Sequence, residues 1–287
     1  MLKWKIGEVT VTRVVEMAVD AAVDGPIPFM LDATPAALKT MPWLWPYYVT
    51  PKGELRLSFH ALLVEAPGMK LVVDTCMGND KPRKELGGNA LHTAFLEDLT
   101  AAGFSRDSVD AVVCTHLHVD HVGWNTMLEN GKWVPTFPKA RYLFSRQDYE
   151  HFLDFDDAHQ QAIMSDSIAP IFDAGLAQTV ELNHRISPEL RLIPTVGHTP
   201  GHVSVMIESK GETAVITGDM IHHPCQIGRP DWSTEYDTDK KASAATRHAV
   251  LKDWVDKPIL VIGTHFAAPT AGHVKRDGDA YRFEGQA

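Results

Sequence analysis

Four metal-binding side chains lie within one short segment, HLHVDH at residues 116–121. The segment directly follows the apolar run 109–115, which is typical of a strand buried on both faces. His116 and His118 are two positions apart in extended chain, so their rings are expected on the same side. The backbone then turns toward a helix, which redirects Asp120 and His121. Imidazole and carboxylate are donors that zinc and similar divalent ions prefer, so this loop predicts the beginning of two adjacent metal sites.

Three further residues of metal-binding type each follow an apolar, strand-like run. His198 follows LRLIPTVG, Asp219 follows TAVITG, and His265 follows ILVIGT. Because donors at strand ends converge on one edge of the sheets, we expect all seven side chains to meet around metal ions. A single histidine of this kind is usually structural, but three strand ends that share the feature are poorly explained as independent accidents.

Three residues beside these motifs are predicted to support the site. Asp74 ends the run MKLVVD and is expected to orient a metal-bound histidine from behind. His202 would do the same, or would stabilise only its own turn. His222, three positions after Asp219, would face the substrate oxygen or the leaving group; the alternative is that it only packs beside the site.

The rest of the chain predicts two sets of strands with helices between them. One domain over residues 1–287 is expected, because no polar, flexible stretch divides the sequence. Alternating apolar residues predict a hairpin over 3–15, whereas six prolines make residues 20–54 an irregular excursion. The other predicted strands are 55–65, 69–74, 109–115, 141–145, 178–182, 190–194, 202–208, 213–218 and 258–262. The predicted helices are 90–102, 146–153, 159–173 and 241–254.

Composition narrows the possible partners. A formal net charge of −10 opposes nucleic acid as a partner, because its phosphates repel an acidic surface. No apolar stretch approaches the length of a transmembrane helix, and charged residues from Lys3 to Arg13 interrupt any secretory apolar run. A cytoplasmic location without a membrane partner is therefore expected. Cys76, Cys114 and Cys225 are widely spaced and predict buried thiols rather than a disulfide framework.

The order of these motifs resembles the metallo-β-lactamase superfamily. After HxHxDH come GHTPGH at 197–202, GDMIH at 218–222, GTH at 263–265, GH at 272–273 and AYRF at 280–283. The order is most similar to methyl parathion hydrolase and its relatives, and more distantly to the acyl-homoserine lactonases. The resemblance runs from about residue 55 to the C-terminus. It implies an α/β (α+β) fold, a four-layer αββα sandwich of two mixed sheets with helices outside.

The same resemblance implies two metal sites that share a bridging Asp219 and a hydroxide. The first site would comprise His116, His118 and His198, and the second Asp120, His121 and His265. Two divalent ions are expected, zinc first; manganese, iron and cobalt stay open because ligand type alone does not choose among them. Such ions bring the pKa of a shared water close to neutral, and the resulting hydroxide is the expected nucleophile.

At two positions the sequence differs from known members of the family, and these differences narrow the range of expected activities. The β-lactamases with a cysteine ligand would need a thiol near Asp219, and Cys225 is too far along the chain, which argues against antibiotic hydrolysis. Acyl-homoserine lactonases have a tyrosine three residues after the bridging aspartate. Here that position is His222, which matches the parathion-hydrolase branch.

Aromatic residues are expected to form the walls of the substrate site. Trp43, Trp45, Tyr47 and Tyr48 lie on the excursion, which would fold over the metals as a lid. The alternative is that these rings pack the excursion onto the body or form a dimer contact. The other pocket candidates are Trp124, Asn125, Gln226 and Arg229. Aromatic walls favour a neutral, apolar or aromatic substrate.

The sequence therefore predicts a dinuclear metal-dependent hydrolase of a carboxylic ester or lactone, with phosphotriester hydrolysis as a side activity. The residues predicted to take part in catalysis are Asp120, Asp219 and His222. The expected partner is a small molecule, and a homodimer is left open.

Three alternatives compete with this prediction. A glutathione-thioester hydrolase would need a basic patch, and the basic cluster at 81–84 (Lys81, Arg83 and Lys84) is well upstream of the motifs. An oxygen-binding diiron protein is opposed, because those proteins resemble HxExD at the first loop. A non-catalytic metal-binding module would normally lack part of the donor set, and none of it is missing here.

Overall fold

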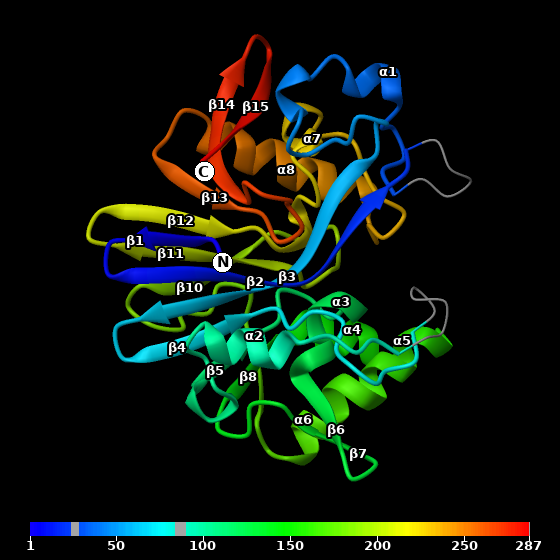
Figure 1. Cartoon of the computed structure of the whole chain (residues 1–287), viewed down its shortest axis with the longest axis vertical. Helices are drawn as coiled ribbons and strands as arrows, with labels where there is room; N and C mark the ends of the chain where they lie inside the picture. The colour runs from blue at the N-terminus through cyan, green and yellow to red at the C-terminus, as the bar shows by residue number, and fades with distance from the viewer. Residues whose placement is uncertain (24–28, 84–89, 287) are drawn as a thin grey trace. The chain divides into compact units, whose positions relative to one another are not determined.

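The computed structural model describes residues 1–23, 29–83 and 90–286, and the chain divides into two compact units (Figure 1). The first unit comprises Met1–Glu16 and Phe59–His184, and the second comprises Met17–Ser58 and Arg185–Ala287. Each unit has one mixed sheet, or most of it, a separate apolar core and its own share of the predicted donors.

A seven-stranded sheet lies mainly in the first unit, in the order β1-β2-β3-β4-β5-β8-β9. Its strands are β1 (Lys3–Ile6), β2 (Val9–Ala21), β3 (Leu55–Ala66), β4 (Met69–Val73), β5 (Ala111–Val113), β8 (Arg141–Ser145) and β9 (Ala177–Val180). Strands β4, β5, β8 and β9 run parallel, and β3 pairs antiparallel with β4. Central parallel strands are covered on both faces, which is why all three residues of β5 are apolar and buried. A separate hairpin joins β6 (Thr126–Glu129) to β7 (Lys132–Pro135).

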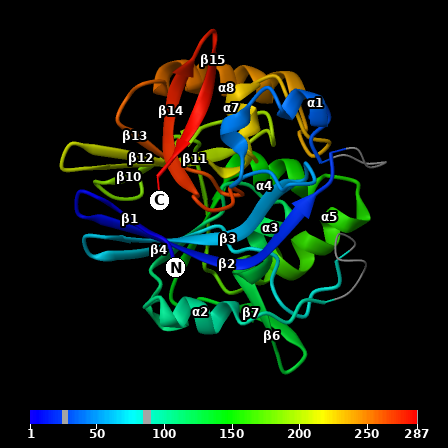
Figure 2. The ribbon, with the colours of Figure 1, turned by 45° about the horizontal axis from the view of Figure 1, so that its top comes forward.

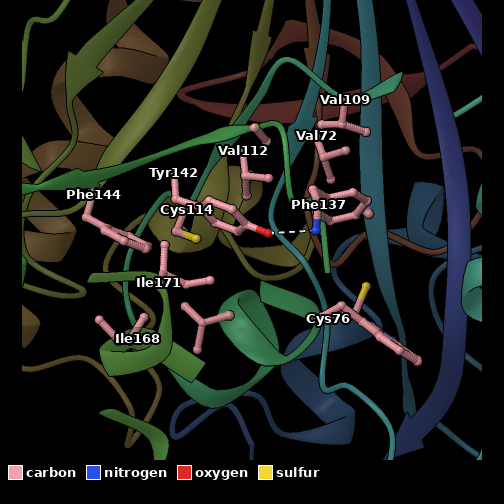
Figure 3. Packing of buried hydrophobic residues seen from close by; sticks show 14 of the residues in the cluster. Val72, Cys76, Val109, Val112, Cys114, Phe137, Tyr142, Phe144, Ile168 and Ile171 are labelled. Atoms are coloured by element: carbon pink, nitrogen blue, oxygen red, sulfur yellow. Dashed lines mark hydrogen bonds between the residues drawn. The ribbon is translucent and has the colours of Figure 1, made fainter. Parts of the chain in front are cut away.

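Helices of the first unit bury their apolar faces against this sheet. They are α2 (Phe95–Ala101), α3 (Val119–Val122), α4 (Arg146–Leu153), α5 (Ala158–Ile163) and α6 (Ala169–Asp173), with 3-10 turns at Arg106–Ser108 and Gly123–Asn125. Ile171 of α6 packs in one cluster with Val112 and Phe144 of the sheet (Figure 3). In the same cluster the backbone N–H of Phe137 donates to the Tyr142 hydroxyl at 2.9 Å, so this buried oxygen is satisfied (Figure 3).

The second unit contains a six-stranded sheet in the order β10-β11-β12-β13-β14-β15. Its strands are β10 (Leu190–Pro194), β11 (Val203–Ser209), β12 (Glu212–Ile216), β13 (Ile259–Ile262), β14 (Ala271–Asp277) and β15 (Ala280–Gly285). Its helices are α1 (Pro35–Leu38), α7 (Cys225–Gly228) and α8 (Lys240–Trp254), with 3-10 turns at Pro42–Leu44 and Gly218–Met220. Figure 2 shows α8 beside the β14–β15 hairpin, as does Figure 1. The excursion belongs to this unit, where Leu38, Leu44 and Tyr48 share a core cluster with Phe266 and Phe283.

The two predicted mixed sheets with helices are confirmed, but several boundaries are wrong. The helix expected from residue 90 begins only at Phe95, and Leu91 instead pairs with Asn79 in an isolated bridge. The helix predicted over 159–173 is interrupted by a π-helical turn, Met164–Ile168. Pro170 lacks an N–H, so the carbonyl of Asp166 is free to accept from Lys81 and Thr126. The hairpins β6–β7 and β14–β15 were not among the predicted strands.

The three cysteines are buried and unpaired by disulfides, as expected. Burial raises the pKa of each thiol, so all three are uncharged at neutral pH. Across the described ranges, every helix is too short or too polar to cross a membrane.

Candidate metal centre

The first donor set lies on the loop that leaves β5 and enters α3. His116 Nε2 is 3.0 Å from His118 Nδ1, and the ring centroids of His116 and His121 are 3.9 Å apart. Nε2 of His121 is 3.5 Å from a carboxylate oxygen of Asp120. Donors held at about 2.1 Å from a tetrahedral zinc ion lie about 3.4 Å from one another, so the His116–His118 pair and the Asp120–His121 pair each have a separation that fits one ion. The four predicted donors of this loop are therefore brought together within the first unit.

Asp74 supports this loop from behind. Its Oδ2 is 2.9 Å from Nδ1 of His121, and its Oδ1 accepts from the backbone N–H of Thr115 at 2.8 Å. The Thr115 hydroxyl donates to Asp74 Oδ2 at 3.0 Å and lies 3.1 Å from Nδ1 of His116. Asp74 thus contacts a ligand that it is predicted to orient, and the Nδ1 contacts leave Nε2 of both histidines for a metal.

The loop is also held by packed residues that are not open to a substrate. Trp124 is only 4% exposed; its indole N–H donates to Glu16 at 2.6 Å, and its ring stacks on Phe95. Asn125 is fully buried and accepts from the Thr75 hydroxyl at 3.0 Å. These contacts hold Trp124 and Asn125 within the first unit, and their predicted place in the substrate pocket stays a prediction.

The second donor set lies in the second unit, at the ends of three strands. His198 follows β10, Asp219 follows β12 in the turn Gly218–Met220, and His265 follows β13. Asp219 Oδ2 is 3.5 Å from Nε2 of His198, whereas its Oδ1 is 3.0 Å from Nε2 of His265. The two carboxylate oxygens thus face different histidines, and all three side chains are almost completely buried. A carboxylate placed in this way can bridge two ions.

Hydrogen bonds select the donor nitrogen of each histidine in this set. Nδ1 of His265 is 3.3 Å from the Ser58 carbonyl, so it carries the proton and leaves Nε2 as a donor. Nδ1 of His198 is 3.0 Å from Oδ1 of Asp237. The pKa of His198 is lowered, with burial as the main cause and Asp237 opposing it, so its ring is neutral, as metal binding requires. Asp237 was missed in the sequence, where no motif marks it.

His202 is part of a hydrogen-bonded chain behind Asp219. Its Nε2 accepts from the backbone N–H of Asp219 at 2.8 Å, so Nδ1 carries the proton and donates to the Thr195 hydroxyl at 2.9 Å. Thr195 in turn contacts the Ser204 hydroxyl, which donates to the Thr217 carbonyl at 2.7 Å. Both nitrogens of His202 are thereby used, and the residue positions the Asp219 backbone rather than offering a ligand.

His222 lies beside Asp219 in a buried position. Its Nε2 is 3.3 Å from Asp219 Oδ2, and donor atoms of His198, Asp219 and His222 lie within 4.8 Å of one another. Neither ring nitrogen has a hydrogen-bond partner, although the side chain is only 3% exposed. Burying unpartnered nitrogens costs free energy, which a metal ion or a polar substrate atom would offset. Phe29 packs edge-on against the ring at 5.7 Å.

Gln226 and Arg229 both make hydrogen bonds within the second unit, and their predicted place in the substrate pocket stays a prediction. Gln226 is fully buried; its carbonyl accepts from the backbone N–H of His222 at 2.7 Å, and its amide donates to Trp232 at 2.9 Å. Arg229 donates to the Gly228 carbonyl and to the Thr40 hydroxyl. Gln226 therefore fixes the segment that carries His222, and Arg229 ties the excursion to α7.

The aromatic residues of the excursion pack onto the second unit. Tyr48 is 2% exposed, its hydroxyl donates to the Pro269 carbonyl at 2.7 Å, and its ring contacts Phe283. The Trp45 indole donates to Thr50, and Trp43 lies partly buried in the same cluster. Tyr47 is exposed. For Tyr48 and Trp45 these contacts favour the packing alternative over the predicted lid.

A family model described as the metallo-beta-lactamase superfamily matches residues 60–274, more than half of the chain. The N-acyl homoserine lactonase of Bacillus thuringiensis is 26% identical over 180 residues, which are 58% of this chain and 65% of that protein. The match thus spans less than two thirds of that relative. Another N-acyl homoserine lactonase, from a Bacillus species, is 25% identical over 230 residues, 75% of this chain and 84% of that protein.

Two solved structures resemble the whole chain. The hydrolase AbOPH of the beta lactamase superfamily is 25% identical, with a TM-score of 0.81 over 99% of this chain and 97% of that one. AidC, a dizinc quorum-quenching lactonase, is 21% identical, with a TM-score of 0.82 over 100% and 97%. At that identity the likeness to AidC shows the fold alone, and it agrees with the predicted fold class.

Proposed function

Because the chain belongs to the metallo-beta-lactamase superfamily, we propose that it is a metal-dependent hydrolase whose two donor sets together hold two divalent metal ions, zinc first. One ion would bind His116, His118 and His198, and the other Asp120, His121 and His265. Asp219 would bridge them. This proposal depends on one observation about Asp219: one of its carboxylate oxygens faces His198 and the other faces His265.

The proposed chemistry is hydrolysis at a carbonyl or phosphoryl centre. When bound, the two ions would lower the pKa of a shared water and take up charge that develops on the substrate oxygen. Asp120 and Asp219 would hold the reacting groups in position. His222 would contact the substrate oxygen or the leaving group, since neither ring nitrogen makes a hydrogen bond to the protein and Nε2 lies 3.3 Å from Asp219 Oδ2.

The proposed substrate is a neutral, apolar or aromatic carboxylic ester or lactone, with phosphotriesters as a side activity. The curated relatives named above are N-acyl homoserine lactonases, which supports the lactone class. His222 at the position three residues after Asp219 supports a placement near the methyl parathion hydrolase branch. Hydrolysis would then proceed without a serine or cysteine nucleophile.

An aromatic series beside His118 supports an apolar substrate. The His118 ring is edge-on to Phe152 with centroids 5.7 Å apart, and Phe152 contacts Phe155 at 5.9 Å. Phe152 is buried, but Phe155 and Leu153 are 42% and 48% exposed. Exposed apolar side chains that continue from a metal ligand to the surface would bind an acyl chain or an aryl group.

The basic cluster that a glutathione-thioester hydrolase would need is not available to a substrate at Lys81 and Arg83. Lys81 and Arg83 are buried, and both contact Asp166, Arg83 through two bonds of 2.7 and 2.8 Å. Their charges are therefore used inside the first unit and cannot bind the carboxylates of glutathione. Lys84, the third member of that cluster, lies outside the described residues.

A substrate panel with metal analysis tests the proposal. Purified protein should contain close to two metal ions per chain and should hydrolyse aryl esters, N-acyl homoserine lactones or both, with slower turnover of phosphotriesters. Removing the metal with a chelator should abolish turnover, and adding zinc should restore it. Turnover of glutathione thioesters alone would contradict the substrate class, whereas a metal content near zero after zinc loading would contradict the metal centre.

A further inference from the structure

Asp237 is a buried carboxylate that no sequence motif predicts. Its side chain is completely inaccessible to solvent. Oδ1 accepts from Nδ1 of His198 at 3.0 Å and from the Ser243 hydroxyl at 3.2 Å, while Oδ2 accepts from the Thr234 N–H at 3.1 Å. Although burial would raise its pKa, the bonds from His198 and the charge of Arg247 lower it, so Asp237 is ionised.

Arg247 of α8 supplies the compensating charge. Its guanidinium is fully buried, and Nη1 lies 3.9 Å from Asp237 Oδ2. It donates to the Ser243 hydroxyl at 2.6 Å and to the carbonyls of Pro230 at 2.7 Å and Met220 at 3.3 Å. Arg247 therefore contacts both the loop that carries Asp237 and the turn that carries Asp219.

The turn before His198 is built to receive this helix. Gly197 has φ +129°, and a Cβ there would lie 2.2 Å from the backbone nitrogen of Ser243. The backbone N–H of Asp239 donates to the Gly197 carbonyl, and that of Thr238 donates to the His198 carbonyl, both at 2.9 Å. The N-terminus of α8 and the His198 turn are thus fixed to each other by backbone contacts.

We propose that Asp237, held in place by Arg247, is a positioning residue that orients the metal ligand His198. The inference rests on the proposed metal centre and names the residues that set the orientation of one of its ligands. By accepting the Nδ1 proton, Asp237 fixes the tautomer and leaves the Nε2 lone pair facing Asp219 at 3.5 Å. A carboxylate in this position makes imidazole a stronger donor, and its loss typically weakens metal binding 10- to 100-fold.

The same arrangement recurs in the first unit, which supports the assignment. Asp74 contacts Nδ1 of His121 at 2.9 Å, and it too is buried and bonded to backbone. Each donor set therefore has one ligand with a carboxylate on its far nitrogen. The competing explanation is that Asp237 only balances the charge of Arg247 and stabilises the start of α8.

Two variants separate positioning from charge balance. Asp237→Asn keeps the shape of the side chain but removes its charge, so zinc affinity should fall about 10- to 100-fold. It also leaves Arg247 buried without a counterion, so the metal-free protein should become less stable. In the double variant Asp237→Asn/Arg247→Met no buried charge is left, so stability should recover while zinc affinity stays low. Asp253→Asn, at an exposed aspartate of α8 paired with Lys257, is the matched control and should change neither.

Zinc affinity is measured by competition with a chromophoric chelator, and stability by urea unfolding of the metal-free protein. If the double variant regained wild-type zinc affinity together with stability, Asp237 would be structural and the inference would be overturned. Unchanged affinity in Asp237→Asn would overturn it as well. Because neither measurement uses a substrate, the outcome is independent of which ester or lactone is hydrolysed.

Discussion

The two donor sets are built in opposite ways. In the first unit four donors lie within residues 116–121, and their geometry follows from one strand exit and one short helix. In the second unit three donors are spread from residue 198 to residue 265. Their meeting depends on the sheet: β12 and β13 are parallel neighbours, and β10 runs in the same direction, so all three strands end at one edge. The first set is formed by one local segment, whereas the second depends on tertiary structure. Only for the first set can the orientation of the donors be predicted from the sequence.

The largest effect is expected where one residue serves both proposed ions. Asp219→Ala should reduce turnover by about 1,000-fold or more, about 4 kcal/mol of transition-state stabilisation, and lower the metal content to less than one ion per chain. His118→Ala removes a ligand of one ion, so it should also abolish turnover but keep about one ion. Metal analysis and kinetics with a shared substrate distinguish the two. Equal metal loss in both variants would contradict a bridging role for Asp219.

A smaller effect, a loss of zinc affinity, is expected when Asp74, the carboxylate behind the first donor set, is replaced. Asp74→Asn should weaken zinc binding about 10- to 100-fold, because His121 loses the group that orients it. Asp107→Asn, at an exposed ion pair with Lys139, should leave zinc affinity unchanged. If Asp74→Asn bound zinc normally while Asp237→Asn did not, the local loop would orient its own ligands without a tertiary partner.

The second unit should be the more sensitive to mild acid because it buries His223. Burial lowers the pKa of this residue from 6.5 to about 4, and its ring contacts the Tyr48 carbonyl at 2.8 Å. Between these pH values the unfolded chain binds more protons, so the stability that His223 contributes is complete above pH 6.5 and is lost as pH falls toward 4. At pH 5 the loss is about 2 kcal/mol.

Urea unfolding of the metal-free protein at pH 7.5 and pH 5 measures this loss. The decrease in the free energy of unfolding should be about 2 kcal/mol smaller in His223→Gln than in the wild type. His248→Gln, at an exposed histidine, should decrease like the wild type. An identical decrease in all three proteins would assign the acid sensitivity to other groups.

The smallest effect is expected at the substrate wall. Phe155→Ser removes an exposed ring of the series beside His118, so KM for long-chain or aryl substrates should rise about fivefold, corresponding to about 1 kcal/mol of lost apolar contact, with kcat little changed. Leu128→Ser, at another exposed apolar residue of the first unit, is the control. If Trp43→Ala shifted substrate preference and Phe155→Ser did not, the wall would belong to the excursion of the second unit.

Much of the fold and of the donor set follows from sequence, whereas contacts between segments that are distant in sequence do not. The apolar run before His116 predicts a buried strand because such periodicity reports burial directly. The sequence predicts a place in the pocket for Trp124 and Asn125 from their proximity to the metal loop, but it does not predict that their polar atoms contact Glu16 and Thr75, which are distant in sequence. The helix predicted over 159–173 ignored the local effect of Pro170.

The sequence by itself determined which side chains can bind metal and which strand each one follows, because side-chain chemistry and local periodicity are properties of short segments. Only the tertiary structure decided which nitrogen of His198 is left for a metal and which carboxylate holds its other side. Asp237, on the loop after α7, contacts His198, and Arg247 of α8 contacts Asp237; no spacing along the chain encodes these contacts. Hydrogen bonds between segments that are distant in sequence depend on how the whole fold brings those segments together, so they leave no local pattern in the sequence.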